Sequence, residues 1–118
     1  MESSQGVWKF HYDEDGFLIA ENNAFGEDVC RAVSDFVDDV RSLRFADELV
    51  EEWEEIKRNY PQDPTGVAFN ATQAELVDGG KVIIESLYGQ FSAVELSEKE
   101  FSRVIREFRD FLRVQAGK

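Results

Sequence analysis

The sequence predicts an α+β fold, in which an antiparallel β-sheet made of a hairpin and a meander carries three helices. Two observations indicate this class. Short extended runs separated by tight turns lie at the start and in the second half of the chain, and apolar residues recur at helical spacing between them and at the end. The expected order is ββ-αα-βββ-α, and strands segregated from helices favour antiparallel pairing with the helices on one side. With 118 residues, 42% of them apolar, we expect a single domain over residues 1–118, with residues 1–6 flexible.

The first element is a predicted β-hairpin. Residues 7–12 alternate between apolar and polar, which places Trp8, Phe10 and Tyr12 on one face. The sequence Asp13-Glu14-Asp15-Gly16 is typical of a turn, and the apolar run at 17–20 continues as the second strand.

Two helices are predicted after the hairpin. The first runs from Glu27 to about Leu43, and apolar residues three and four apart form its buried stripe. The second runs from Phe45 to Asn59, and Pro61 ends it. The stripe of the first helix contains Val29, Cys30, Val33, Phe36, Val37 and Val40, and that of the second contains Leu49, Trp53 and Ile56.

A meander of three or four strands and a last helix complete the predicted fold. The expected strands cover residues 67–69, 73–77, 81–87 and 92–96. Ser97 and Glu100 match the capping box, in which each side chain bonds the backbone N–H of the other residue, so a helix should begin there. We expect this helix to lie across the sheet with an apolar face made of Phe101, Val104, Ile105, Phe108, Phe111 and Leu112.

Charge is the unusual property of the chain. Its 25 acidic and 13 basic residues give a net charge of −12, and residues 1–60 hold sixteen of the acids and only six of the bases. Such a charge repels nucleic acid and anionic membranes and attracts cationic proteins. The apolar runs are too short to span a bilayer, Cys30 is the lone cysteine, and the first residues lack the pattern of a signal peptide. We therefore expect a cytoplasmic protein that binds neither nucleic acid nor membrane.

Candidates for catalysis or metal binding are few. His11 is the lone histidine, and a surface position explains it better than a catalytic one. Cys30 lies in the first turn of a predicted helix, where a thiolate is favoured, but it also belongs to the apolar stripe of an inert, buried cysteine. The turn at Asp13 resembles the start of a calcium loop, yet Phe17 and Leu18 stand where that loop needs an oxygen ligand and a glycine. We expect no catalytic residue, cofactor or metal.

The second predicted helix concentrates the negative charge. Six carboxylates fall within nine positions, and like charges four residues apart cost about 0.2–0.5 kcal/mol per pair. If the first two helices are neighbours, their outer faces form one anionic surface, which is either simply solvated or a docking site for a basic protein. An aromatic side chain near the charge, such as Tyr60, Trp53 or Tyr88, would provide an apolar contact at its centre. The expected partner-binding residues are Asp35, Asp38, Asp39, Asp47, Glu48, Glu51, Glu52, Glu54, Glu55 and Tyr60.

Two segments, the opening hairpin over residues 8–17 and the junction over residues 96–101 with the helix that follows it, carry a resemblance to known proteins. In this layout the chain resembles the small acidic immunity proteins of bacterial polymorphic-toxin and contact-dependent growth inhibition systems. The resemblance implies an antitoxin that binds and neutralises a cognate basic toxin domain, often a nuclease. It carries over no functional residue.

Three functions are consistent with the sequence. The first hypothesis is a toxin-neutralising immunity protein whose acidic face binds a basic toxin domain. The second is a non-catalytic regulatory or adaptor domain with a different protein partner, and the third is a small enzyme that uses carboxylates or His11. The sequence leaves the identity of the partner, the blocked surface and the oligomeric state open.

Overall fold

The computed structural model describes residues 6–117 and has the α+β architecture that the sequence predicts. The sequence predicts that residues 1–6 are flexible. Residues 1–5 are outside the described residues, and the carbonyl of Gly6 accepts a hydrogen bond from Arg103. The elements in chain order are β1 (Lys9–Tyr12), β2 (Leu18–Glu21), α1 (Glu27–Val40), α2 (Leu43–Asn59), β3 (Gly66–Ala68), β4 (Thr72–Val77), β5 (Lys81–Ser86), β6 (Val94–Ser97) and α3 (Glu98–Ala116).

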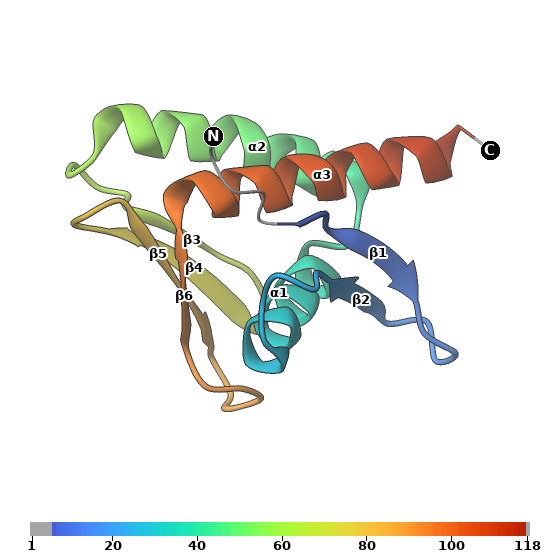
Figure 1. The fold of residues 1–118 in the computed structure, drawn as a ribbon. Coiled ribbons are helices and arrows are strands. Elements are labelled where there is room, and N and C mark those ends of the chain that lie inside the picture. Colours follow the sequence, from blue (N-terminus) through green and yellow to red (C-terminus); the bar gives the residue numbers. More distant parts are fainter. Residues whose placement is uncertain (1–5, 118) are drawn as a thin grey trace.

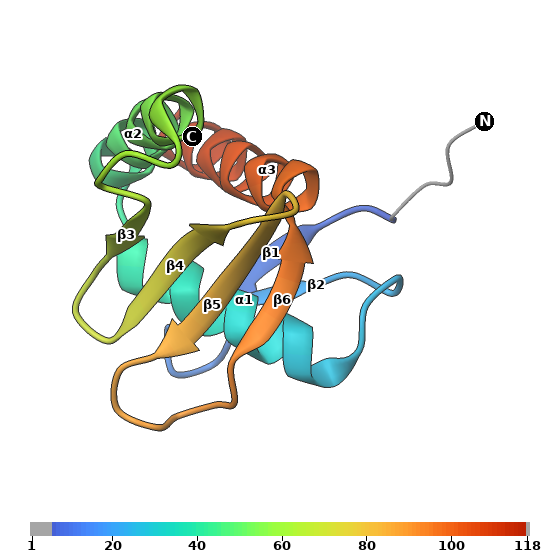
Figure 2. The ribbon, with the colours of Figure 1, turned by 90° about the vertical axis from the view of Figure 1, so that its left-hand side faces the viewer.

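The strands form two separate antiparallel sheets. Within residues 6–117, the meander has four strands in the order β3-β4-β5-β6, and β1 pairs only with β2. The strands are antiparallel as predicted, but the hairpin and the meander do not form the one sheet that the sequence led us to expect. Helix α1 lies behind the meander and contacts β4, β5 and β6, while it also contacts β2 of the hairpin (Figure 2). One helix therefore joins the two sheets, which explains why Phe36, Val37 and Val40 of α1 are fully buried.

Helices α2 and α3 lie side by side and run in opposite directions (Figure 1). This arrangement corrects the prediction that the last helix lies across the sheet. Helix α1 covers the meander, whereas α3 packs mainly along α2. The aromatic residues of α3 explain its position. Phe101 contacts Phe36 of α1 and Trp53 of α2, and Phe108 contacts Phe10 of the hairpin. As expected, the apolar face of α3 supplies much of the core.

The boundary between the first two helices differs from the prediction. Helix α1 ends at Val40 rather than near Leu43, and α2 begins at Leu43 rather than Phe45. The reason is Ser42, whose hydroxyl accepts the backbone N–H of Phe45 at 3.2 Å and caps the start of α2.

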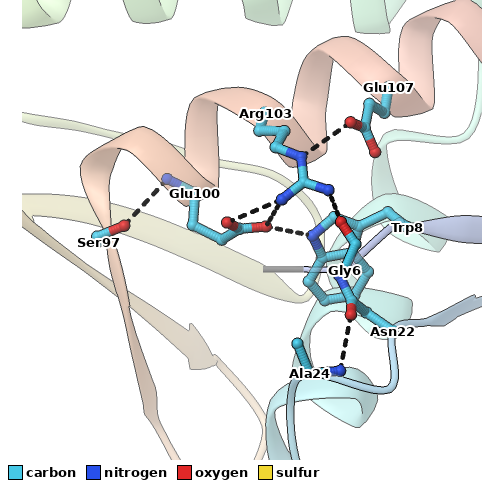
Figure 3. A network of polar contacts seen from close by, with 8 residues as sticks. All are labelled: Gly6, Trp8, Asn22, Ala24, Ser97, Glu100, Arg103 and Glu107. Carbon is cyan, nitrogen blue, oxygen red and sulfur yellow. Dashed lines mark hydrogen bonds and ion pairs between the residues drawn. The ribbon is translucent and has the colours of Figure 1, made fainter. Parts of the chain in front are cut away.

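The predicted capping box at the start of α3 forms in one direction only. The Ser97 hydroxyl accepts the backbone N–H of Glu100 at 3.1 Å, as expected. The Glu100 carboxylate, which is only 5% exposed, instead accepts Trp8 Nε1 at 2.6 Å and lies 3.2 Å from Arg103 Nη1 (Figure 3). Arg103 also bonds Glu107 at 3.0 Å and the carbonyl of Gly6. This buried network ties the segment before β1 to α3.

Candidate functional site

The outer face of α2 carries the exposed part of the predicted acidic surface. The residues of α2 that face the core are apolar and buried: Ala46, Leu49, Val50, Trp53 and Ile56. The opposite side is exposed, with Arg44 and Arg58 toward its two ends and four glutamates between them: Glu48, Glu51, Glu52 and Glu55, which we call the α2 ridge. The 3.6-residue period of the helix produces this separation, so the ridge faces solvent.

The ridge has few internal counter-charges. Glu48 lies 3.5 Å from Arg44 on the same helix. Glu51, Glu52 and Glu55 form no ion pair within residues 6–117, which the structure describes. The ridge therefore combines exposure with unbalanced negative charge.

The other two carboxylates of the predicted α2 cluster are neutralised by basic residues. Asp47 lies 3.2 Å from Arg113, and Glu54 bonds Arg106 and lies 3.2 Å from Lys57. The two arginines belong to α3, so the Asp47–Arg113 and Glu54–Arg106 pairs lie across the junction of α2 and α3. The acidic surface is accordingly narrower than the sequence predicted, and Asp47 and Glu54 help to join the helices.

Asp39 of α1 holds the turn between β3 and β4. Its Oδ2 atom accepts the backbone N–H groups of Ala71 at 2.8 Å and Thr72 at 3.0 Å, and the Thr72 hydroxyl at 2.8 Å. Thr72 is buried, so this carboxylate satisfies donors that water does not reach. Asp39 therefore has a structural role.

Asp38 of α1 performs a similar task for the hairpin. Its Oδ1 atom accepts the backbone N–H of Leu18 at 3.0 Å, and Ser34, one turn earlier, accepts that of Ala20 at 2.8 Å. These two N–H groups point away from β1, and a strand edge with free N–H groups would otherwise invite pairing with another chain. Asp38 also lies 2.5 Å from Arg41, which balances its charge.

Asp35 of α1 is more accessible than Asp38, since their side chains are 33% and 24% exposed. It is half-buried, and its Oδ2 lies 3.5 Å from Arg31 Nε. Burial raises the pKa of Asp35 above its usual value, Arg31 opposes this effect, and the neighbouring Asp38 and Asp39 charges add to it.

The structure therefore does not join the acids of α1 and α2 into one surface. Helix α2 packs against α3, and Asp38 and Asp39 point toward the hairpin and the meander. This corrects the expectation of a single anionic face, which required α1 and α2 to be close neighbours.

The three aromatic candidates occupy different environments. Trp53 is fully buried and donates its indole N–H to Glu98 at 3.0 Å, so it is part of the core. The Tyr60 hydroxyl donates to Asp78 at 2.5 Å, and this hydrogen bond is the main cause that raises the pKa of Tyr60. Tyr88 is 76% exposed in the loop after β5. Of the three, only Tyr88 presents a largely free ring.

The residues considered for catalysis or metal binding lie in different elements of the structure. His11 is exposed on β1, and the Cys30 thiol is half-buried and lies 3.6 Å from the carbonyl of Asn22. The Asp13 carboxylate accepts the backbone N–H groups of Asp15 and Phe17, both at 2.9 Å, which is the geometry of a hairpin turn. Within residues 6–117, no group of three or more acidic, histidine or cysteine side chains is arranged to hold a metal ion.

Comparisons with protein-family models, curated proteins and solved structures found no match to the chain. Among the residues that the structure describes, none of the helices combines the length and apolar character that crossing a membrane requires.

Proposed function

We propose that this chain is a cytoplasmic immunity protein that binds and neutralises a cognate basic toxin domain through the α2 ridge. The observation that carries the proposal is the exposure of Glu51, Glu52 and Glu55 without ion pairs on a helix whose other carboxylates have basic partners. The immunity role itself rests on the resemblance of the sequence to such proteins.

Electrostatic repulsion within the ridge supports a role outside the fold. Glu48 and Glu52, and likewise Glu51 and Glu55, lie four residues apart, and each such pair costs about 0.2–0.5 kcal/mol. Within residues 6–117, the fold gains no ion pair from Glu51, Glu52 or Glu55. A basic partner would convert the repulsion into attraction and accelerate association.

A nuclease domain is the partner class that fits this surface. Nucleases bind phosphate groups in positively charged grooves, and a helix with closely spaced carboxylates offers a row of negative charges to such a groove. Complementary charge also discourages wrong partners, which suits an antitoxin that recognises one toxin.

Capture of the partner from the native host tests the ridge. The wild-type chain is compared at low salt with the triple variant Glu51→Lys, Glu52→Lys, Glu55→Lys. The matched control is Glu14→Lys, Asp15→Lys, Asp63→Lys, which changes the net charge equally at three exposed carboxylates that form no ion pair within residues 6–117. We expect the ridge variant to lose the partner and the control to retain it. Equal capture by both variants would show that the ridge is not the binding surface.

The immunity role requires a separate test. The captured partner is expressed alone and together with the wild-type chain or the ridge variant, and bacterial growth is measured. We expect growth arrest by the partner alone, rescue by the wild-type chain and loss of rescue with the ridge variant. A partner that does not arrest growth would instead identify the chain as an adaptor.

A further inference from the structure

A groove with an apolar floor lies between β2 and α1, away from the α2 ridge. Its volume is about 420 Å³. Phe17, Ile19 and Cys30 contribute apolar surface, and Phe17 is 54% exposed. An exposed aromatic ring beside an open groove offers contact area to a ligand.

Negative charge surrounds this groove. Its walls carry five carboxylates, against the single guanidinium of Arg31: Asp13, Glu21, Glu27, Asp35 and Asp38. A second hollow, of about 440 Å³, shares Phe17, Arg31, Asp35 and Asp38 and continues toward Thr72. The two hollows join at these four residues, where Arg31 is the only basic side chain.

Asp35 retains capacity to accept hydrogen bonds. Arg31 Nε is 3.5 Å from Asp35 Oδ2, whereas charge-assisted hydrogen bonds are typically about 2.7–2.9 Å long. The Asp35 side chain is 33% exposed beside Arg31, so a ligand can reach it. Asp38, in contrast, is engaged with Leu18 and Arg41.

We infer that this groove receives an arginine side chain of a protein partner, with the guanidinium between the Phe17 ring and the Asp35 carboxylate and the aliphatic stem along Ile19. Charge complementarity selects a cation, and the apolar floor selects one with an aliphatic stem. Arginine suits the site better than lysine because its planar, weakly hydrated guanidinium stacks on aromatic rings and bonds carboxylates in a fork. The inference does not depend on the α2 ridge or on the immunity role.

A titration with N-acetyl-arginine amide, followed by two-dimensional ¹⁵N NMR of the full chain, tests the groove. N-acetyl-citrulline amide is the matched control, since it has the same shape without the charge. We expect saturable shifts of the Phe17, Arg31 and Asp35 amides with arginine, at a dissociation constant on the order of millimolar for a single side chain. The citrulline compound should leave these amides in place.

Two pairs of variants make the test specific. Asp35→Asn and Phe17→Ala should each weaken binding about tenfold, as expected for the loss of one charge-assisted bond or one stacking contact. Glu55→Gln on the ridge and Phe45→Ala, which removes another exposed ring (48%), should bind like the wild type. The proposal is overturned if citrulline binds equally, if the groove variants bind normally, or if the same amides shift when the protein concentration alone is raised, which would assign the groove to a second copy of the chain.

Discussion

The carboxylates of α1 and those on the outer face of α2 have opposite relations to the fold. Asp38 and Asp39 of α1 accept backbone N–H groups from the hairpin and from the β3–β4 turn. Glu51 and Glu55 of α2 are exposed and form no ion pair among residues 6–117. Carboxylates of α1 therefore hold the hairpin and the β3–β4 turn in place, whereas those on the outer face of α2 form an unbalanced surface charge.

This difference shows that charge density along the sequence does not identify a binding surface. A carboxylate that faces a strand edge or a turn compensates backbone donors and is part of the fold. A carboxylate on the solvent-facing side of an amphipathic helix contributes little to stability, but it attracts positively charged partners. Substitutions of inward-facing and outward-facing carboxylates should therefore differ in their effect on stability.

The largest effect is expected at Glu100, the most deeply buried carboxylate in the network of Figure 3. Glu100→Ala leaves the Trp8 indole N–H and one side of the Arg103 guanidinium without their acceptor. We expect the free energy of unfolding to fall by about 3 kcal/mol, measured by urea denaturation. A loss below about 0.5 kcal/mol, the size of a surface effect, would contradict the assignment of Glu100 to the fold.

The next effect is expected at Asp39. Asp39→Ala removes the acceptor of two backbone N–H groups and of the buried Thr72 hydroxyl. The free energy of unfolding should fall by about 2 kcal/mol in the same urea assay. The control Asp39→Asn keeps one side-chain oxygen and should lose less. If both variants are as stable as the wild type, α1 does not hold the β3–β4 turn through this carboxylate.

Several features of the fold follow directly from sequence patterns. The hairpin, the amphipathic stripes and the Ser97 cap are local, and the structure confirms the elements that they predict. The hydrogen bonds of Asp38 and Asp39 are not local. Asp38 accepts the N–H of a residue 20 positions away, and Asp39 accepts those of residues 32 and 33 positions away. The exposure of Phe17 is equally invisible in the sequence, where it appears as one more apolar strand residue. Tertiary packing decides these roles, and a single sequence carries no signal of it.

A smaller effect that depends on pH is expected at Glu98. Burial acts to raise the pKa of Glu98, but hydrogen bonds from Ser102 and Trp53 and the charge of Lys57 outweigh it, so the pKa lies below its usual value near 4.5. A carboxylate with a lowered pKa in the folded state stabilises the protein above its unfolded-state pKa, and this contribution is lost as pH falls through the folded-state pKa.

Comparison of wild type with Glu98→Gln measures this contribution. The wild type should have the higher urea midpoint at pH 7, and the gap should narrow as the pH falls below about 4.5. A gap of constant size across this range would show that ionised Glu98 does not stabilise the fold through its contacts with Trp53 and Lys57.

The smallest effect on stability is expected for the ridge. The triple variant Glu51→Gln, Glu52→Gln, Glu55→Gln removes repulsion without removing an internal contact. Its free energy of unfolding should stay the same or rise by a few tenths of a kcal/mol in urea denaturation. A marked loss of stability would show that these glutamates stabilise the fold, as the inward-facing carboxylates do.

The rate of association with the captured partner shows whether the α2 ridge is a docking surface. Stopped-flow measurements at several salt concentrations compare the wild type, the ridge variant with lysine at positions 51, 52 and 55, and the control with lysine at positions 14, 15 and 63. We predict that only the ridge variant associates at least about tenfold more slowly at low salt and loses most of its salt dependence. Equal rates and equal salt dependence for the two variants would contradict a docking role for the α2 ridge.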